Sequence, residues 1–211
     1  MKGLLLKEWY QLVAQGKFIL LSAVIMFGAS AVTLANGKGL PGFLVYACFL
    51  LGIFPMTLFT YDELAGWVEY SYAFPVSKAQ LTGVKYLLGL LCTAVGTLCT
   101  AVVLAIWGGG LDRNYTTLLL VESVCAPLLA NAGLLLLSFR FGSTKARYLY
   151  FVIVALFAGL LGFGVSSDDE LGHAMAEAPL PALLGVVVLS LVLYAASWKL
   201  STVWYGKSRD I

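Results

Sequence analysis

Six long apolar runs constrain the fold of this chain more than any other feature of its sequence. Each run is about as long as the roughly 20 residues that a helix needs to cross a bilayer. The runs are continuously apolar rather than alternating, so helices are expected and barrel strands are not. We predict an all-α integral membrane protein whose residues 1–211 form a single transmembrane domain, with six spans at about 18–35, 43–61, 86–107, 115–139, 148–165 and 181–198.

The composition excludes an ordinary soluble domain and a metal or disulfide framework. Only 11% of the residues are charged and 61% are hydrophobic, whereas about a quarter of a soluble chain is charged. No C-x-x-C pair occurs, and His173 has no second ligand near it, so no zinc site, other metal site or disulfide framework is expected. The cysteines are expected to be small packing residues within apolar runs: Cys48, Cys92, Cys99 and Cys125.

Basic residues are divided unequally between the segments on the two sides of the predicted spans. One side holds only Lys38 and Arg113. Because cytoplasmic segments carry the excess of Lys and Arg, the other side is expected to be cytoplasmic, with both termini there and the acidic 166–180 loop outside. The cytoplasmic side holds eleven basic residues: Lys2, Lys7, Lys17, Lys78, Lys85, Arg140, Lys145, Arg147, Lys199, Lys207 and Arg209.

The first sixteen residues form a separate amphipathic unit. Leu5, Trp9 and Leu12 lie near one face of a helix, while Lys7 and Glu8 lie largely elsewhere. We predict an interfacial helix over 1–16 that lies on the cytoplasmic leaflet with its aromatic residues at headgroup depth. The alternative is that these residues are only the first turns of a long first span.

The segment 62–77 is the largest internal cytoplasmic interruption. Asp62 is expected to cap a short helix that Pro75 ends, since the residue before a proline avoids helical geometry. Ser77 and Gln80 then form a capping box, from which a helix is expected to run unbroken to Trp107. Lys78 and Lys85 share a face of that helix, where they are expected to reach phosphates or the acids of a partner.

This segment carries more aromatic surface than a connector needs. Such a patch indicates docking to another protein. The alternative is packing against lipid or against the chain's own bundle, and the residues alone do not decide between the two.

At these residues the chain resembles the ABC-2 type transporter permeases, in the branch of small six-span bacterial permeases that includes peptide and antimicrobial exporters. The shared features are the acidic pair Asp62-Glu63, Gly66-Trp67, the Pro75-Val76-Ser77-Lys78 stretch and Lys85-Tyr86, while Phe74 replaces the usual leucine. The opening "KGLLLKEWY" also resembles the start of the family.

The resemblance implies a permease subunit that forms half of a membrane pathway, in a homodimer or heterodimer, above two separate ATPase subunits. It implies that the 1–16 helix is the connecting or elbow helix and that the segment after span 2 is a coupling helix seated on the ATPase. The implied contact residues are Asp62, Glu63, Leu64, Trp67, Tyr70, Phe74, Pro75, Ser77 and Lys78. No G-x-x-x-x-G-K-[ST] phosphate loop is present, so ATP and Mg²⁺ are expected on the partner ATPase and no cofactor or catalytic residue on this chain.

Glu122 and Asn131 are the candidate pathway residues. An acid inside a span faces a bundle interior or water and marks a functional site, which could meet a cationic substrate. The alternative is that Glu122 lies near the headgroups because the fourth span begins later. Asn131 is expected to bond a neighbouring helix.

The expected function is export of a peptide or other amphipathic molecule across a bacterial plasma membrane. A non-transporting membrane sensor or assembly factor is the alternative. An integral membrane enzyme is disfavoured, because catalytic side chains are not clustered at one depth. The expected partners are the bilayer, a second permease and the ATPase, and no nucleic acid.

Overall fold

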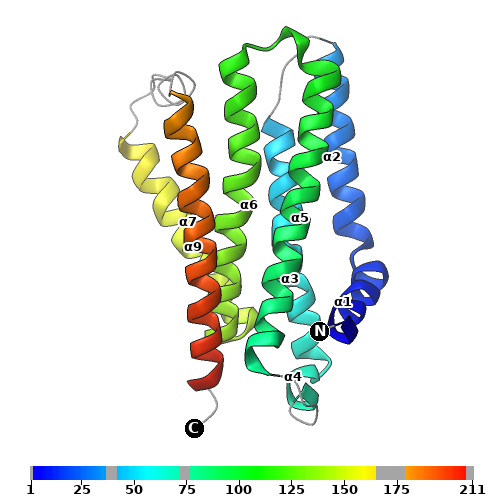
Figure 1. The fold of residues 1–211 in the computed structure, drawn as a ribbon, viewed down its shortest axis with the longest axis vertical. Helices are drawn as coiled ribbons and strands as arrows, with labels where there is room; N and C mark the ends of the chain where they lie inside the picture. Colours follow the sequence, from blue (N-terminus) through cyan, green and yellow to red (C-terminus); the bar gives the residue numbers. More distant parts are fainter. Residues whose placement is uncertain (1, 37–41, 72–76, 165–178, 208–211) are drawn as a thin grey trace.

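In the part of the chain that the structure describes, long helices lie side by side, and the short helices α1 and α4 lie at one end of the bundle. The computed structural model describes residues 2–36, 42–71, 77–164 and 179–207, and every regular element in these ranges is helical. The long helices are α2 (Lys17–Ala35), α3 (Gly42–Leu64), α5 (Lys78–Trp107), α6 (Arg113–Phe141), α7 (Ser143–Gly164) and α9 (Leu180–Lys207) (Figure 1). The short elements are α1 (Lys2–Gln15), α4 (Trp67–Tyr70) and the 3-10 turn η2 (Gly108–Gly110).

Five of the described helices are long and apolar enough to cross a membrane: α2, α3, α5, α6 and α9. The predicted span 148–165 falls in α7, which is not among these five helices, so the prediction that it crosses the membrane stays a prediction. The unbroken helix from Lys78 to Trp107 is confirmed. Of the predicted external loop 166–180, residues 166–178 lie outside the described residues.

The helices extend beyond several of the predicted span boundaries. Helix α3 continues through Leu64, α7 begins at Ser143 and α9 continues to Lys207. The hydropathy pattern marks where side chains stop being apolar, but backbone hydrogen bonds hold a helix equally well in the headgroup layer and in water. The predicted boundaries refer to the membrane-crossing part of each helix, so they stay a prediction.

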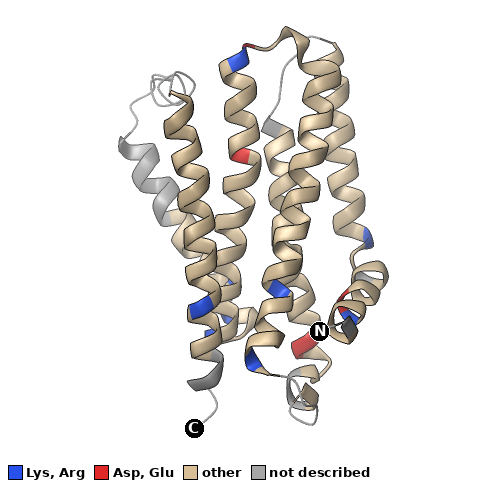
Figure 2. Cartoon of the chain, viewed as in Figure 1, with Lys and Arg blue, Asp and Glu red and all other residues tan. Residues whose placement is uncertain are grey.

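Lys and Arg residues are concentrated at the end of the bundle that carries α1 and α4 (Figure 2). We name this the basic end; Lys17 and Lys78 begin α2 and α5 there, and Arg140 lies in the last turn of α6. At the opposite end of the bundle, the described residues include one basic residue, Arg113. The charge separation expected from the sequence is thus present in the folded chain.

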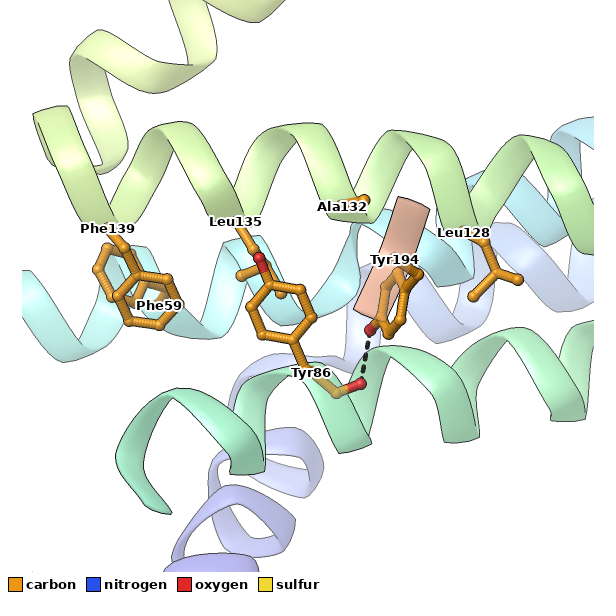
Figure 3. Close-up of a cluster of buried hydrophobic side chains, with 7 residues drawn as sticks. All are labelled: Phe59, Tyr86, Leu128, Ala132, Leu135, Phe139 and Tyr194. Carbon is orange, nitrogen blue, oxygen red and sulfur yellow. Dashed lines mark hydrogen bonds between the residues drawn. The ribbon is translucent and has the colours of Figure 1, made fainter. Parts of the chain in front are cut away.

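Helix α6 is the centre of the bundle. In its most apolar window 61% of the residues are buried, against 17% in α2. Its inner face packs with α3, α5 and α9 in a cluster made of Phe59, Tyr86, Leu128, Ala132, Leu135, Phe139 and Tyr194 (Figure 3). The rings of Phe59 and Phe139 meet edge to face at 4.9 Å. This cluster fixes the end of α3 and the start of α5, which flank the predicted coupling segment.

Helices α3 and α6 approach each other at backbone distance. A Cβ atom added at Gly52 would lie 2.4 Å from Cβ of Pro127, which is closer than atoms of two side chains can come. A small residue is therefore required there, as at many contacts between membrane helices.

Candidate functional site

The end of α3 differs from the sequence prediction. Asp62 lies inside α3 and does not cap a new helix, so that part of the prediction is wrong. The helix ends at Leu64, and Gly66 follows with φ +66°, the left-handed geometry in which glycine commonly ends helices. Helix α4 begins at Trp67. Asp62 has no need of backbone N–H groups, because two lysine side chains reach it.

These lysines belong to a charge cluster formed by Lys7, Glu8, Asp62 and Lys85. Lys85 Nζ lies 2.7 Å from Glu8 Oε2 and 2.6 Å from Asp62 Oδ2. Lys7 Nζ lies 3.2 Å from Glu8 Oε1 and also pairs with Asp62 Oδ1. Two cations and two anions alternate, so the cluster is neutral overall. It joins α1, α3 and α5.

Burial makes this cluster unusual. Glu8 and Asp62 are 3% exposed and Lys85 is 4% exposed. Charges removed from water in this way are tolerated only when they are paired and hydrogen-bonded. Gln11 adds a bond from its Nε2 to Asp62 Oδ1 at 2.7 Å.

The charge cluster also touches α4. Lys7 Nζ lies 4.6 Å from the centre of the Trp67 ring, within the range of a cation–π contact. Beside it is a cavity of about 20 Å³, lined by Glu8, Asp62, Trp67 and Lys85 among others. This space holds about one water molecule. The side chain of Trp67 therefore contacts the charge cluster and lines the cavity beside it.

Helix α1 turns polar as well as apolar side chains toward the bundle, where Leu12 packs against the buried cluster that contains Phe54. Helix α1 is separate from α2, with Gly16 between them, as one of the two predicted alternatives required. Its polar side chains Lys7 and Glu8 face the bundle, whereas Trp9 and Tyr10 are 59% and 66% exposed. Sequence reasoning missed Lys7 and Glu8 as site residues. The adjacent Lys-Glu pair in an apolar helix was the available signal.

Lys85 corrects a further prediction. It was expected to share a face with Lys78 and to reach phosphates or a partner's acids, but it is buried and pairs with acids of its own chain. Lys78 is exposed. The two side chains therefore have different surroundings although the helix places them on the same side.

Glu63 points to a different helix from Asp62. Its Oε2 accepts a hydrogen bond from the backbone N–H of Ser143 at 2.8 Å. This N–H is the first of α7, where helix N–H groups lack partners within the helix. Nearby, Arg147 Nη2 donates to Thr60 Oγ1 at 3.2 Å. The acidic pair thus reaches α1 and α5 through one residue and α7 through the other.

The remaining predicted contact residues, five in number, fall into three groups. Leu64 and Tyr70 are 79% and 68% exposed and available to a partner. Ser77 forms the predicted capping box: Gln80 N donates to Ser77 Oγ at 3.2 Å, and Ser77 N donates to Gln80 Oε1 at 3.1 Å. Phe74 and Pro75 lie outside the described residues.

A second polar network, the tyrosine network, begins next to Lys85. Tyr86 Oη lies 2.7 Å from Oγ of both Ser197 and Ser201. Tyr194 Oη donates to the Tyr86 carbonyl at 2.6 Å (Figure 3). Asn131 Nδ2 donates to Tyr194 Oη at 3.1 Å. The network joins α5, α6 and α9 without any formal charge.

The candidate pathway residues have different surroundings. Asn131 is fully buried, and the predicted bond to a neighbouring helix is confirmed by its contact with α9. Glu122 is partly buried in α6, and no ion pair reaches it from the described residues. The assignment of either residue to a pathway stays a prediction. In residues 2–36, 42–71, 77–164 and 179–207, no group of His, Cys, Asp and Glu is arranged to hold a metal ion.

Comparison with known proteins agrees with the resemblance of the motifs. A family model described as ABC-2 family transporter protein matches residues 3–206. A search of curated proteins finds no match. The matched range contains both polar networks and all of the long helices except the last residue of α9, which fits a multi-pass membrane protein. The chain therefore belongs to the ABC-2 family of transporter proteins.

Proposed function

We propose that this protein is the permease subunit of an ABC-2 type exporter and that α4, with the exposed residues beside it, seats on a separate ATPase subunit. Permeases of the family generally work with an ABC ATPase. The exposure of two large side chains supports docking at α4. Leu64 and Tyr70 are exposed beside α4, at the point where α1, α3 and α5 meet in the charge cluster.

The proposed orientation puts the basic end in the cytoplasm of a bacterial cell, with both termini there. The excess of Lys and Arg at that end supports it. Helix α7 is the proposed sixth span and α1 the proposed elbow helix. The exposure of Trp9 and Tyr10 supports contact of α1 with the headgroup layer, where aromatic residues are enriched.

The proposed assembly contains two permeases and two ATPase subunits, the latter binding ATP and Mg²⁺. The proposed cargo is a peptide or another amphipathic molecule. Glu122 is the proposed pathway residue, because an acid at that depth needs a polar or cationic partner and the described residues supply no ion pair.

Co-purification tests the docking surface. We expect an ATP-binding subunit encoded with this chain to co-purify from membranes, and Leu64→Ala with Tyr70→Ala to reduce its recovery about tenfold or more. Tyr115→Ala is the matched control, because Tyr115 is a partly exposed tyrosine at the opposite end. Equal recovery with the control and with the double variant would refute docking at this surface.

Glu122→Gln tests the pathway. We expect transport into inverted vesicles to fall while ATPase recovery stays unchanged, because the variant removes a charge far from the docking surface. Transport at the unaltered rate would return Glu122 to the membrane interface.

A further inference from the structure

We infer that Asp62 and Glu63 form a two-sided joint at the end of α3, through which movement of α4 reaches two separate groups of helices. Asp62 transmits this movement to α1 and α5, and Glu63 transmits it to α7. This inference rests on the proposed function, since the movement would come from an ATPase seated on α4.

The first side of the joint consists of buried ion pairs. Asp62 pairs with Lys7 of α1 and Lys85 of α5. Lys7 also lies over the ring of Trp67. A displacement of α4 therefore acts on Lys7 directly and on α5 through Asp62.

The second side consists of one charged hydrogen bond and a close approach. Glu63 accepts the first N–H of α7 from Ser143, where the positive end of a helix favours a carboxylate. Gly142 precedes it with φ +83°, and a Cβ atom there would lie 3.4 Å from Glu63 Oε1. The Arg147–Thr60 bond joins the same two helices one turn away.

Helix geometry explains why the adjacent residues Asp62 and Glu63 contact different helices. Consecutive residues of an α-helix point about 100° apart. Asp62 and Glu63 therefore cannot both face the same neighbouring helix. Rotation or translation of the last turn of α3 strains both contacts, and the loss of either residue releases one side only.

Hydrogen exchange on the full chain in lipid nanodiscs, with no ATPase present, tests the division into two sides. The amide variants Asp62→Asn and Glu63→Gln keep an acceptor oxygen but lose its charge, and the weaker hydrogen bond corresponds to about tenfold in local opening. We expect Asp62→Asn to speed exchange in α1 by this factor and to leave the first turn of α7 unchanged. Glu63→Gln should do the reverse. Asp112→Asn is the matched control, because Asp112 is exposed and its side chain caps no helix.

A second variant separates transmission from simple stabilisation. Asp62→Asn leaves the cluster with one excess positive charge, whereas Asp62→Asn with Lys85→Met restores neutrality. We expect the double variant to recover thermal stability but not the effect of the permease on ATP hydrolysis in the co-purified complex. That effect should fall about two- to thirtyfold, the range for residues that lie between coupled sites. Glu63→Gln should reduce it as well.

The outcomes distinguish the two proposals. If each single variant loosens α1 and α7 alike, or if the double variant regains both stability and the effect on hydrolysis, the joint is refuted. If no ATPase co-purifies with the unaltered chain, the proposed function fails, while the exchange pattern still decides whether Asp62 and Glu63 hold separate sides.

Discussion

The two polar networks begin at neighbouring residues of α5 but are built from different chemistry. Lys85 belongs to the charge cluster, which joins α1, α3 and α5 at the basic end. Tyr86 belongs to the tyrosine network, which joins α5, α6 and α9 through hydroxyl, amide and carbonyl groups. The comparison teaches that the ion pairs among the described residues lie where the bundle meets α4, whereas the network further in is built from neutral bonds.

The physical reason for the difference is the cost of charge in lipid. An ionised side chain is expensive within a span and less so near the ends. Neutral hydrogen bonds between membrane helices are individually modest but cost little when rearranged. The charge cluster should thus be sensitive to removal of one member, and the tyrosine network should tolerate single losses.

Lys85→Met should have the largest effect. It leaves Glu8 and Asp62 with Lys7 as the remaining cation of the cluster, and breaking a buried ion pair from one side costs about 3–5 kcal/mol. Reversible unfolding in mixed detergent micelles measures the loss. Lys78→Met is the control and should change stability by less than about 0.5 kcal/mol, since Lys78 is exposed. Similar losses for both lysines would mean that the cluster carries no special stability.

Gly89→Ala should come next, because it forces the tyrosine network apart sterically. A Cβ atom at Gly89 would lie 1.6 Å from Asn131 Nδ2 and 2.7 Å from Tyr194 Oη. We expect a loss of about 1–3 kcal/mol in the same unfolding measurement. Gly28→Ala is the matched control, since nothing lies within 4 Å of its added Cβ, and it should be neutral or stabilising. Equal behaviour of the two variants would contradict the close packing of α5 on α6.

Tyr194→Phe should cost about 1 kcal/mol, which is typical of polar contacts between membrane helices. It removes the hydroxyl that donates to the Tyr86 carbonyl and accepts from Asn131 while keeping the ring. The same measurement applies, with Tyr115→Phe as control. A loss as large as that of Lys85→Met would overturn the contrast between charged and neutral networks.

Ser201→Ala should have the smallest effect, about 0.5 kcal/mol, because Tyr86 Oη keeps Ser197 as a partner. The double variant with Ser197→Ala should cost more than the sum of the single losses, since the hydroxyl then has neither serine. Strict additivity in this double-mutant cycle would show that the two serines do not share one partner.

Much of the fold was predictable because it depends on local patterns. The capping box at Ser77 and the helix from Lys78 to Trp107 follow from side chains within one turn of each other. The break at Gly16 was one of two alternatives, and the structure contains it. The end of α3 was less predictable, because Asp62 has the chemistry of a cap and only the presence of Lys7 and Lys85 makes it a helix-interior residue.

The sequence named the segment beside α4 as a docking surface, which stays a prediction, and it missed the charge cluster next to that segment. Leu64 at the end of α3 and Tyr70 in α4 are exposed, as a docking surface requires. Glu8 and Lys85 were missed as an ion pair, because 77 positions separate them along the chain. Patterns of spacing report neighbours within a helix and carry no information about which helices meet.

The sequence by itself determined that this chain is helical, apolar and asymmetric in charge, because hydropathy and the distribution of lysine and arginine depend on residue type alone. Only the tertiary structure decided which charges meet. Burial forces each charge to find a partner, and the packing of α1 against the ends of α3 and α5 is what supplies Lys7 and Glu8 to Asp62 and Lys85.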